Sequence, residues 1–259
     1  MNEMTQTIAL AGKGGVGKTT VCGLLIQYLC AKDKGPVLAV DADANSNLNE
    51  VLGVEVELTL GDIREDVARA DIADPSPVPI GMTKQEFAEL KFADALVEGD
   101  DFDMLVMGRT QGKGCYCYVN GILTAQVAKY AGNYRYVVVD NEAGMEHISR
   151  GILPKVDTVI LVSDCSRRGV QAAARIFELT QSLDIGAKEI KLIINRAPGG
   201  VASEGVLEEV RKAGMDLLCV LPHDDTIYEY DSDGIPTVNL PEEDPFKKPL
   251  FAALDKLNF

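Results

Sequence analysis

The sequence feature that most constrains the fold is a glycine-rich segment at residues 12–20, which reads Gly-Lys-Gly-Gly-Val-Gly-Lys-Thr-Thr. This segment matches the pattern G-x-x-x-x-G-K-[ST], follows an apolar run at Thr7–Ala11 and opens a helical pattern at Lys18–Ala31. Glycines allow backbone N–H groups to converge on phosphate oxygens, and the N-terminus of the following helix favours negative charge. The segment therefore predicts a phosphate-binding loop in an α/β fold.

The two polar residues that end the loop have expected tasks. Lys18 is expected to bridge the β- and γ-phosphates of a nucleotide, and the hydroxyl of Thr19 is expected to bind Mg²⁺. The residues expected to contact the nucleotide through this loop are Gly12, Lys13, Gly14, Gly15, Val16, Gly17, Lys18, Thr19 and Thr20.

Apolar runs alternate with helical patterns along the rest of the chain. Because the runs are almost continuously apolar, they predict parallel strands buried on both faces. Their alternation with helices predicts a doubly wound α/β fold, a mostly parallel sheet of about seven or eight strands with helices on both faces, in one domain over residues 1–259. The expected strands are Thr7–Ala11, Pro36–Val40, Asp103–Met107, Arg135–Val139, Thr158–Val162, Ile190–Ile194 and Leu217–Val220, and the expected helices are Lys18–Ala31, Lys84–Val97, Ile122–Tyr130, Arg168–Ser182 and Ser203–Ala213.

Charge and cysteine content narrow the possible partners. The chain has 25 Lys and Arg against 40 Asp and Glu, a formal net charge of −15, which disfavours binding to nucleic acid or to an anionic membrane surface. No apolar stretch approaches the roughly 18 residues that span a bilayer, and Met1–Thr7 is polar. With six cysteines and no export signal, we expect a cytoplasmic protein with free thiols.

Three carboxylates follow apolar runs at positions where ligands bind in α/β sheets. Asp41 and Asp43 come directly after Pro36–Val40, and Asp140 ends the run at Tyr136–Val139. Two carboxylates two residues apart can share a Mg²⁺ shell and a water, although a solvated turn explains the same pattern. An apolar strand that ends in Asp is the Walker B arrangement, so Asp140 is expected to help hold Mg²⁺.

The loop with its additional lysine, Lys13, resembles the deviant Walker A motif of the Min-type, Par-type and nitrogenase-iron-protein ATPases. The resemblance implies a P-loop NTPase fold like that of MinD and a homodimer in which Lys13 reaches the partner's phosphates. It further implies that Asp43 orients the attacking water and that Asp41 lies nearer the metal. In the Ala-Gly-Met-Glu segment, which resembles switch II, Gly144 is the expected sensor of the γ-phosphate.

Two later segments resemble the base-binding parts of the same superclass. Asn195, in Ile-Ile-Asn-Arg, resembles the asparagine that contacts the base edge, and the segment Leu-Pro-His-Asp at 221–224 resembles the loop that frames the ring. ATP is favoured over GTP because the guanine-reading pattern Asn-Lys-x-Asp is absent. The expected base contacts are Asn195, Arg196, Pro222, His223 and Asp224.

A Cys-Tyr-Cys segment predicts a shared metal site. If the segment is extended, Cys115 and Cys117 project to the same side, because successive side chains of extended backbone alternate. Two thiolates are too few for a tetrahedral metal, but a twofold axis would supply the other two from a second subunit. Taken alone, the pattern fits two unrelated loop cysteines as well as it fits a metal site.

The phosphate loop, the Cys-Tyr-Cys segment and Ala-Gly-Met-Glu-His occur in an order and spacing that resemble the nickel-maturation ATPases of carbon monoxide dehydrogenase and acetyl-CoA synthase, the CooC/AcsF family. The resemblance implies that Cys115 and Cys117 bind Ni²⁺ or Zn²⁺ at the interface of a homodimer. It also implies that ATP binding and hydrolysis to ADP control dimerisation and delivery of nickel to either client enzyme.

Alternatives stay open at this point. Glu146 and His147 could relay the loss of phosphate, and His147 could instead be a metal ligand. A reductase like the nitrogenase iron protein would hold an iron–sulfur cluster between subunits, but residues 140–147 contain no cysteine. A spatial regulator like MinD or ParA could use Phe246–Phe259 as an amphipathic anchor, although the pattern favours a helix packed on the core.

Overall fold

The computed structural model describes residues 5–32, 34–43, 45, 47–70, 73, 75–109, 117–142, 155–183 and 185–257, with the backbone alone at residues 117–119. Neither Cys115 nor the residues at positions 144, 146 and 147 fall within this part of the chain. The predictions made for those residues therefore lie outside the described structure.

Seven strands form one parallel sheet within the described residues, which confirms the predicted fold class. The strand order is β3-β2-β4-β1-β5-β6-β7, and neighbouring strands run parallel. Each predicted strand overlaps an observed one, with starts that agree within one residue and ends that agree within three. The strands are β1 (Gln6–Gly12), β2 (Val37–Ala42), β3 (Phe102–Val106), β4 (Tyr136–Asn141), β5 (Thr158–Asp164), β6 (Glu189–Ala197) and β7 (Asp216–Pro222).

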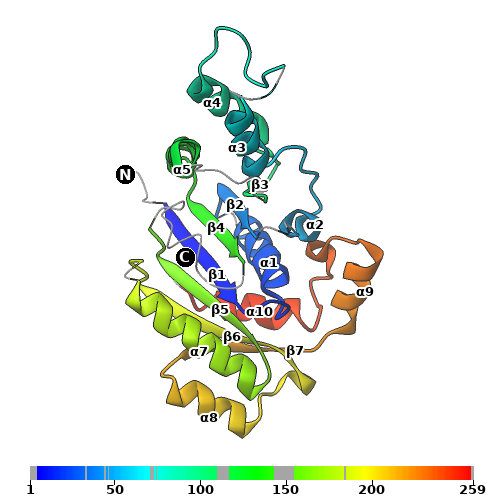
Figure 1. Ribbon diagram of the computed structural model, residues 1–259. Coiled ribbons are helices and arrows are strands. Elements are labelled where there is room, and N and C mark those ends of the chain that lie inside the picture. Colours follow the sequence, from blue (N-terminus) through cyan, green and yellow to red (C-terminus); the bar gives the residue numbers. More distant parts are fainter. Residues whose placement is uncertain are drawn as a thin grey trace.

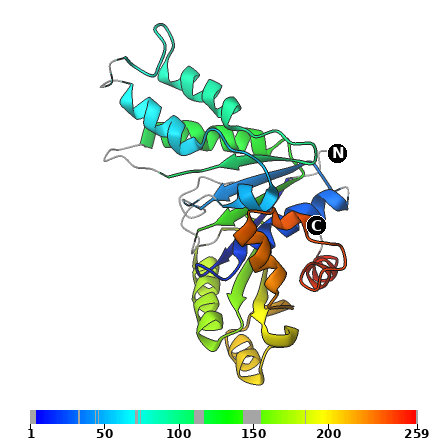
Figure 2. The same cartoon turned by 90° about the vertical axis from the view of Figure 1, so that its right-hand side faces the viewer.

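The two faces of the sheet bury separate hydrophobic clusters, because successive strand residues point to opposite sides. One cluster joins Val137 and Val139 of β4 to helices α3, α4, α5, α7 and α8, whereas the other joins Val138 to α1, α2 and α10. Figures 1 and 2 show the helices on both sides of the sheet. The helices are α1 (Lys18–Ala31), α2 (Leu48–Leu52), α3 (Leu60–Arg69), α4 (Lys84–Ala95), α5 (Cys117–Ala131), α7 (Arg167–Ser182), α8 (Glu204–Lys212), α9 (Asp225–Asp233) and α10 (Lys247–Leu254).

All five predicted helices are present, but one begins well before its predicted start. The observed α5 starts at Cys117, whereas the sequence pattern places the helix at Ile122–Tyr130. Cys117 is therefore the first residue of a helix. This corrects the assumption that the whole Cys-Tyr-Cys segment is extended, on which the i, i+2 argument for two sulfurs facing one metal depends.

Three short helices were not predicted from the sequence. They are α2, α3 and α9, none longer than ten residues. The start of α3 carries a local signal, because the hydroxyl of Thr59 accepts a hydrogen bond from the N–H of Asp62 and the Asp62 carboxylate accepts one from the N–H of Thr59. Reciprocal bonds of this kind form a capping box, which satisfies N–H groups at the start of the helix.

The C-terminal segment packs on the core, as its apolar spacing predicts. Phe246, Leu250 and Leu254 are buried in the cluster that contains α1. The hydroxyl of Tyr28 in α1 donates a hydrogen bond of 2.9 Å to Asp255, just after α10. Within the described residues, no helix combines the length and apolar composition needed to cross a bilayer. The apolar face of α10 is therefore engaged within the molecule.

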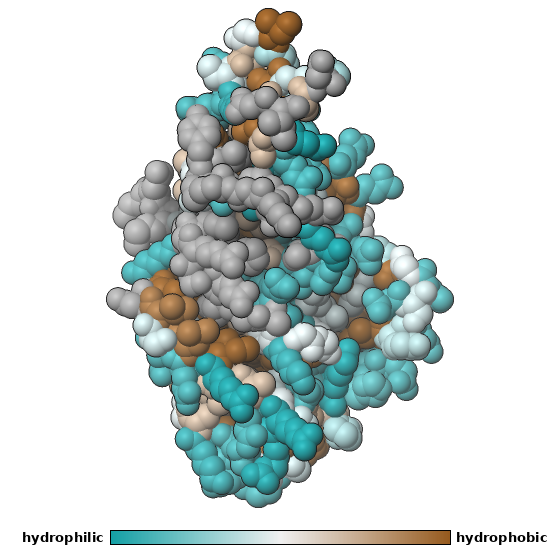
Figure 3. All heavy atoms as spheres, in the orientation of Figure 1, coloured by the Kyte–Doolittle hydropathy of each residue, from teal (hydrophilic) through white to brown (hydrophobic). Residues whose placement is uncertain are grey.

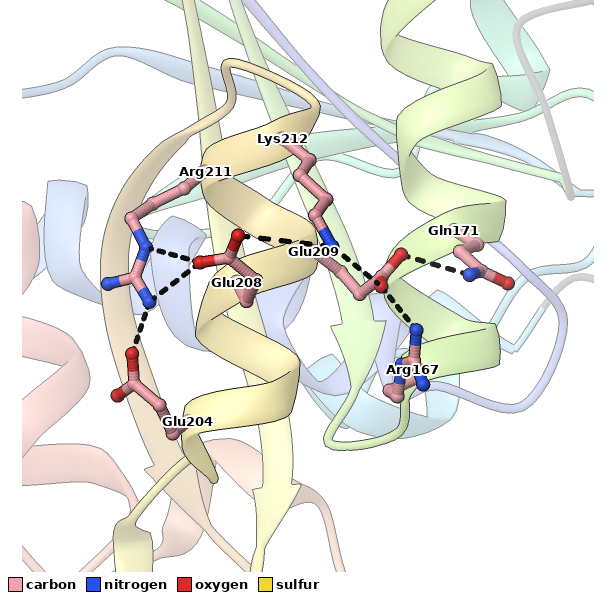
Figure 4. Close-up of polar contacts among 7 residues, drawn as sticks. All are labelled: Arg167, Gln171, Glu204, Glu208, Glu209, Arg211 and Lys212. Carbon is pink, nitrogen blue, oxygen red and sulfur yellow. Dashed lines mark hydrogen bonds and ion pairs between the residues drawn. The ribbon is translucent and has the colours of Figure 1, made fainter.

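Polar contacts join α7 and α8 on the outside of the sheet. The carboxylate of Glu209 accepts hydrogen bonds from Arg167 at 2.6 Å and from Gln171 at 2.9 Å, and Arg211 pairs with Glu204 and Glu208 (Figure 4). The surface around α8 is mostly hydrophilic (Figure 3). Exposed ion pairs of this kind contribute little to stability, because solvent screens them, so the apolar residues beneath them dominate the packing.

Candidate functional site: a nucleotide cradle at the edge of the sheet

The phosphate loop lies between β1 and α1, at the carboxyl edge of the parallel sheet. Gly15 and Gly17 have φ angles of 78° and 89°, in the left-handed region that glycine adopts at little cost. Gly17 also lies close to another strand, because a Cβ atom there would lie 2.4 Å from Nδ2 of Asn195 in β6. The backbone of the loop therefore follows a path that larger residues would disturb.

The two lysines of the loop differ in their surroundings. Lys18, the first residue of α1, is 7% exposed, whereas Lys13 is exposed. A buried ammonium group at the start of a helix is placed to meet an anion bound in the loop, where the helix N-terminus also favours negative charge. An exposed lysine can reach a group outside its own chain. This difference is consistent with the separate roles that the sequence predicts for Lys18 and Lys13.

Asp140 and Thr19 meet beneath the loop. The Thr19 hydroxyl donates a hydrogen bond of 2.6 Å to Oδ2 of Asp140, which is 1% exposed. The other carboxylate oxygen, Oδ1, is buried without a hydrogen-bond partner. Because a buried oxygen without a partner is unfavourable, this atom is suited to a ligand that the nucleotide brings with it.

Asp41 lies beside Asp140 but already holds the backbone around it. The two residues are direct partners in the register of β2 and β4. Oδ1 of Asp41 accepts a hydrogen bond of 2.9 Å from the N–H of Asp43, and Oδ2 accepts one of 3.0 Å from the N–H of Leu48. Asp41 thus fixes both the turn that carries Asp43 and the start of α2, a role that the sequence did not indicate.

Burial raises the pKa of both carboxylic acids. The pKa of Asp140 rises to about 7, because burial and the charges of Asp41 and Asp43 outweigh the hydrogen bond from Thr19 and the charge of Lys18. The pKa of Asp41 rises to about 6, mainly through burial, although backbone hydrogen bonds from Leu48, Asp43 and Asn47 oppose the change. The Thr19 hydroxyl and the unpartnered oxygen of Asp140 are oxygen ligands of the kind that Mg²⁺ prefers, and this ion commonly binds one or two carboxylates together with phosphate oxygens, so the residues present fit it.

The raised pKa of Asp140 predicts how stability depends on pH in the protein without nucleotide and Mg²⁺. The folded state keeps a proton that the unfolded state, with its pKa near 3.8, releases. Stability is therefore lost as pH rises from about 4 to about 7. Asp140→Asn removes this titration, so its unfolding free energy relative to wild type should increase by about 2 kcal/mol between about pH 5 and about pH 7.5.

Urea unfolding at the two pH values measures this difference. Asp94→Asn, on the exposed side of α4, is the matched control. A difference between wild type and Asp140→Asn that stays constant with pH would show that Asp140 does not keep its proton in the folded protein.

A cavity of about 340 Å³ opens beside the phosphate loop, between the ends of β6 and β7 and helix α9. All five residues predicted to contact the base line it, together with Gly17 and Thr20 of the loop. Asn195 is held in place, because its Nδ2 donates to the Val16 carbonyl at 2.9 Å and its Oδ1 accepts from the N–H of Arg196 at 2.7 Å. The predicted phosphate and base contacts are thus brought together around one continuous space.

The far wall of the cavity was missed by the sequence reasoning. It contains Ile227, Tyr228 and Asp231 from α9, with Thr237 and Phe246 beyond that helix. A signal for α9 was present, because Asp224 is its N-cap and accepts a hydrogen bond of 2.8 Å from the N–H of Thr226. The positions of Thr237 and Phe246 follow from the C-terminal segment folding back over α1, which no local pattern indicates.

The predicted metal pair cannot be placed as a site. Cys115 and the side chain of Cys117 lie outside the described residues, as do Gly144, Glu146 and His147. Among the side chains that are described, no group of three or more His, Cys, Asp or Glu residues is arranged to hold a metal ion. Four other cysteines, at positions 22, 30, 165 and 219, are free thiols.

Comparison with known proteins agrees with this geometry. The family model described as the CobQ/CobB/MinD/ParA nucleotide binding domain matches residues 7–238. An uncharacterized ATP-binding protein of Methanocaldococcus jannaschii is 42% identical over 96% of this chain and 97% of its own. The carbon monoxide dehydrogenase accessory protein CooC of Rhodospirillum rubrum is 31% identical over 90% and 89% of the two chains.

Solved structures show the same fold. The septum site-determining protein MinD of Pyrococcus horikoshii, in complex with Mg-ADP, superposes with a TM-score of 0.69 at 24% identity, over 98% of this chain and 97% of its own. A ParA family ATPase of Chlorobium tepidum superposes with a TM-score of 0.71 at 18% identity, over 98% and 99%. At these identities the likeness establishes the architecture alone.

Proposed function

The chain belongs to the CobQ/CobB/MinD/ParA nucleotide-binding family, and we propose that it is an ATP-dependent metallochaperone. In this proposal a single domain over residues 1–259 hydrolyses ATP as a homodimer. Cys115 and Cys117 of each subunit bind Ni²⁺ or Zn²⁺ at the dimer interface. The nucleotide state controls dimerisation and the delivery of nickel to carbon monoxide dehydrogenase or acetyl-CoA synthase.

The arrangement of Thr19, Asp140 and Lys18 carries the ATPase part of the proposal. The hydroxyl of Thr19 and the free oxygen of Asp140 would hold Mg²⁺, while Lys18 contacts the β- and γ-phosphates. Bound Mg²⁺ would neutralise charge on the phosphate oxygens as the terminal phosphoryl group is transferred. Asp43, which is half-buried just after β2, orients the attacking water, and Gly144 senses the γ-phosphate.

The base cavity supports ATP as the nucleotide. Asn195, fixed by its two hydrogen bonds, presents its amide to the cavity that Pro222, His223 and Asp224 also line. Arg196 follows with a φ of 57°, an unusual value for a residue with a side chain. Strained backbone of this kind concentrates at ligand sites, where the surrounding structure enforces it.

Dimer formation is proposed from Lys13. Its side chain is exposed at the mouth of the phosphate loop, so it is available to contact the nucleotide of a facing subunit. The proposed metal site also needs a second subunit, since two thiolates need a second pair to complete a tetrahedral site. Two independent features of one chain thus both require a second copy.

The nickel part of the proposal is supported by the cysteine pair together with the CooC relative. That relative is named as an accessory protein of carbon monoxide dehydrogenase and matches nine-tenths of this chain. Thiolates suit Zn²⁺ and also hold Ni²⁺ in tetrahedral or square-planar sets.

Metal binding by the double variant Cys115→Ala/Cys117→Ala tests the proposal. Wild type should bind one Ni²⁺ or Zn²⁺ per two chains, whereas the variant should lose this stoichiometric metal and still bind ATP. The physical reason is that the variant removes all four thiolates of the shared site but leaves the phosphate loop unchanged. Equilibrium dialysis against each metal, with the mass of the complex measured in parallel, gives both the stoichiometry and the oligomeric state.

The matched control is Cys165→Ala/Cys219→Ala, which also removes two thiols per chain and should bind metal as wild type does. Equal metal affinity in wild type and Cys115→Ala/Cys117→Ala would refute the metallochaperone proposal and leave an ATPase of the family. Visible charge-transfer absorbance in protein purified without oxygen would instead favour an iron–sulfur reductase.

A further inference from the structure

The turn that carries Asp43 is exposed and is shaped by hydrogen bonds. The carboxylate Oδ1 of Asp43 accepts a hydrogen bond of 2.8 Å from the N–H of Asn45. At its other end, the N–H of Asp43 donates to Asp41. Because Asn45 is exposed, packing does not hold it. Whatever fixes Asn45 therefore helps to fix the direction of the Asp43 carboxylate.

A residue from the neighbouring strand reaches this turn. The guanidinium of Arg109 donates a hydrogen bond to Oδ1 of Asn45, across 64 positions of sequence. Arg109 follows β3, the edge strand that pairs with β2. Asn45 thus uses its backbone N–H to hold Asp43 and its side-chain oxygen to accept from Arg109.

The backbone that carries Arg109 is itself closely packed. The N–H of Met107 donates a hydrogen bond of 2.8 Å to the carbonyl of Asp41, which continues the contact between the two strands past the end of β3. A Cβ atom on Gly61, in the first turn of α3, would lie 2.4 Å from the carbonyl oxygen of Arg109. The base of the Arg109 side chain is therefore fixed against both β2 and α3.

The residue before Arg109 explains how the chain turns toward Asn45. Gly108 has a φ of 64°, and a Cβ atom there would lie 2.3 Å from the Thr59 hydroxyl oxygen. A side chain at this position would be strained by the positive φ and would clash with Thr59, which caps α3. The close approach of segment 107–109 to α3 thus sets where Arg109 begins.

We propose that Arg109 is a positioning residue for ATP hydrolysis, which acts by bracing Asn45 and thereby aiming the Asp43 carboxylate. This inference rests on the proposed function, in which Asp43 orients the attacking water. In this role Arg109 acts through the turn, so its loss should affect the chemical step more than substrate binding. Small displacements of an orienting group reduce turnover strongly, because the reacting atoms must meet in a narrow range of geometries.

Steady-state kinetics of four variants test the proposal. Arg109→Ala should lower kcat for ATP about tenfold and leave KM within about twofold of wild type. Asn45→Ala should cause the same loss, and Arg109→Ala/Asn45→Ala should be no worse than either single variant, because both remove one interaction. Arg109→Lys should recover part of kcat, since lysine supplies one donor in place of the guanidinium fork.

The control is Arg211→Ala, which removes exposed ion pairs on α8 and should keep wild-type kcat (Figure 4). Losses that multiply in the double variant, or a raised KM with unchanged kcat in Arg109→Ala, would overturn the proposal. The second result would mean that Arg109 contacts the nucleotide directly.

A measurement that needs no turnover separates this proposal from the proposed function. Hydrogen exchange of the Asn45 amide should be faster in Arg109→Ala than in wild type, because the turn loses its brace. If Arg109→Ala exchanges faster but the wild-type protein does not hydrolyse ATP, the role of Arg109 in fixing the turn is supported and the ATPase function is refuted. Unchanged exchange would refute the brace, whatever the activity of the wild type.

Discussion

Replacing Lys18 with alanine is expected to abolish measurable ATP hydrolysis and to weaken ATP binding by about 100-fold or more. Lys18 is the buried cation of the phosphate loop, at the N-terminus of α1 and beside Asp140. Its ammonium group is the proposed contact to the β- and γ-phosphates. Without it, only the N–H groups of the loop would stabilise the negative charge of these phosphates. Calorimetric titration with ATP and a phosphate-release assay measure the two effects.

Alanine variants of two other lysines serve as comparisons for Lys18→Ala. Lys32→Ala, at the far end of the same helix, removes an exposed pair with Asp255 and should leave ATP binding and turnover unchanged. Lys13→Ala should bind ATP as a monomer, because only its contact to the partner subunit is lost. Intact turnover in Lys18→Ala would contradict the assignment of the phosphate loop.

Asp43→Asn is expected to lower kcat at least about 100-fold with little change in ATP affinity, the loss typical when a positioned acid–base group is removed. The carboxylate of Asp43 is proposed to orient the attacking water, and asparagine keeps its size and its ability to accept from the Asn45 N–H. The turn should therefore keep its shape while the negative charge is lost. Single-turnover hydrolysis, with nucleotide affinity measured separately, distinguishes the chemical step from binding.

The control for Asp43→Asn is Asp216→Asn, because Asp216 begins β7 at the opposite edge of the sheet and pairs there with Lys191. Asp216→Asn should hydrolyse ATP at the wild-type rate. A fall in ATP affinity equal to the fall in kcat for Asp43→Asn would show that this carboxylate binds nucleotide or Mg²⁺ and does not orient water.

The elements predicted well were those with strong local signals. The phosphate loop and α1 agree residue by residue with the pattern, because glycines with left-handed φ angles end one element and a helical run begins the next. Nearly continuous apolar runs identified the strands, since strands buried on both faces leave no polar positions for a helical pattern. The short helices α2 and α9 give too few turns for such a pattern to be distinct.

The start of α5 and the role of Asp41 show where local reasoning was wrong or incomplete. The argument that Cys115 and Cys117 face one side assumed an extended segment, yet α5 extends back to Cys117. Asp41 was considered as a metal ligand or as part of a solvated turn, whereas its two oxygens accept backbone N–H groups from Asp43 and Leu48. Both features depend on the position of the chain against its neighbours.

Local sequence patterns were enough to predict the nucleotide-binding family, the parallel α/β sheet and the phosphate loop, because glycine spacing and apolar runs are signals carried by residues close in sequence. Tertiary contacts alone placed Asn195 against Gly17, closed the base cavity with Phe246, and brought Arg109 to Asn45. These pairings join residues dozens to hundreds of positions apart. Their geometry arises from strand order and helix packing, which no spacing of residue types records.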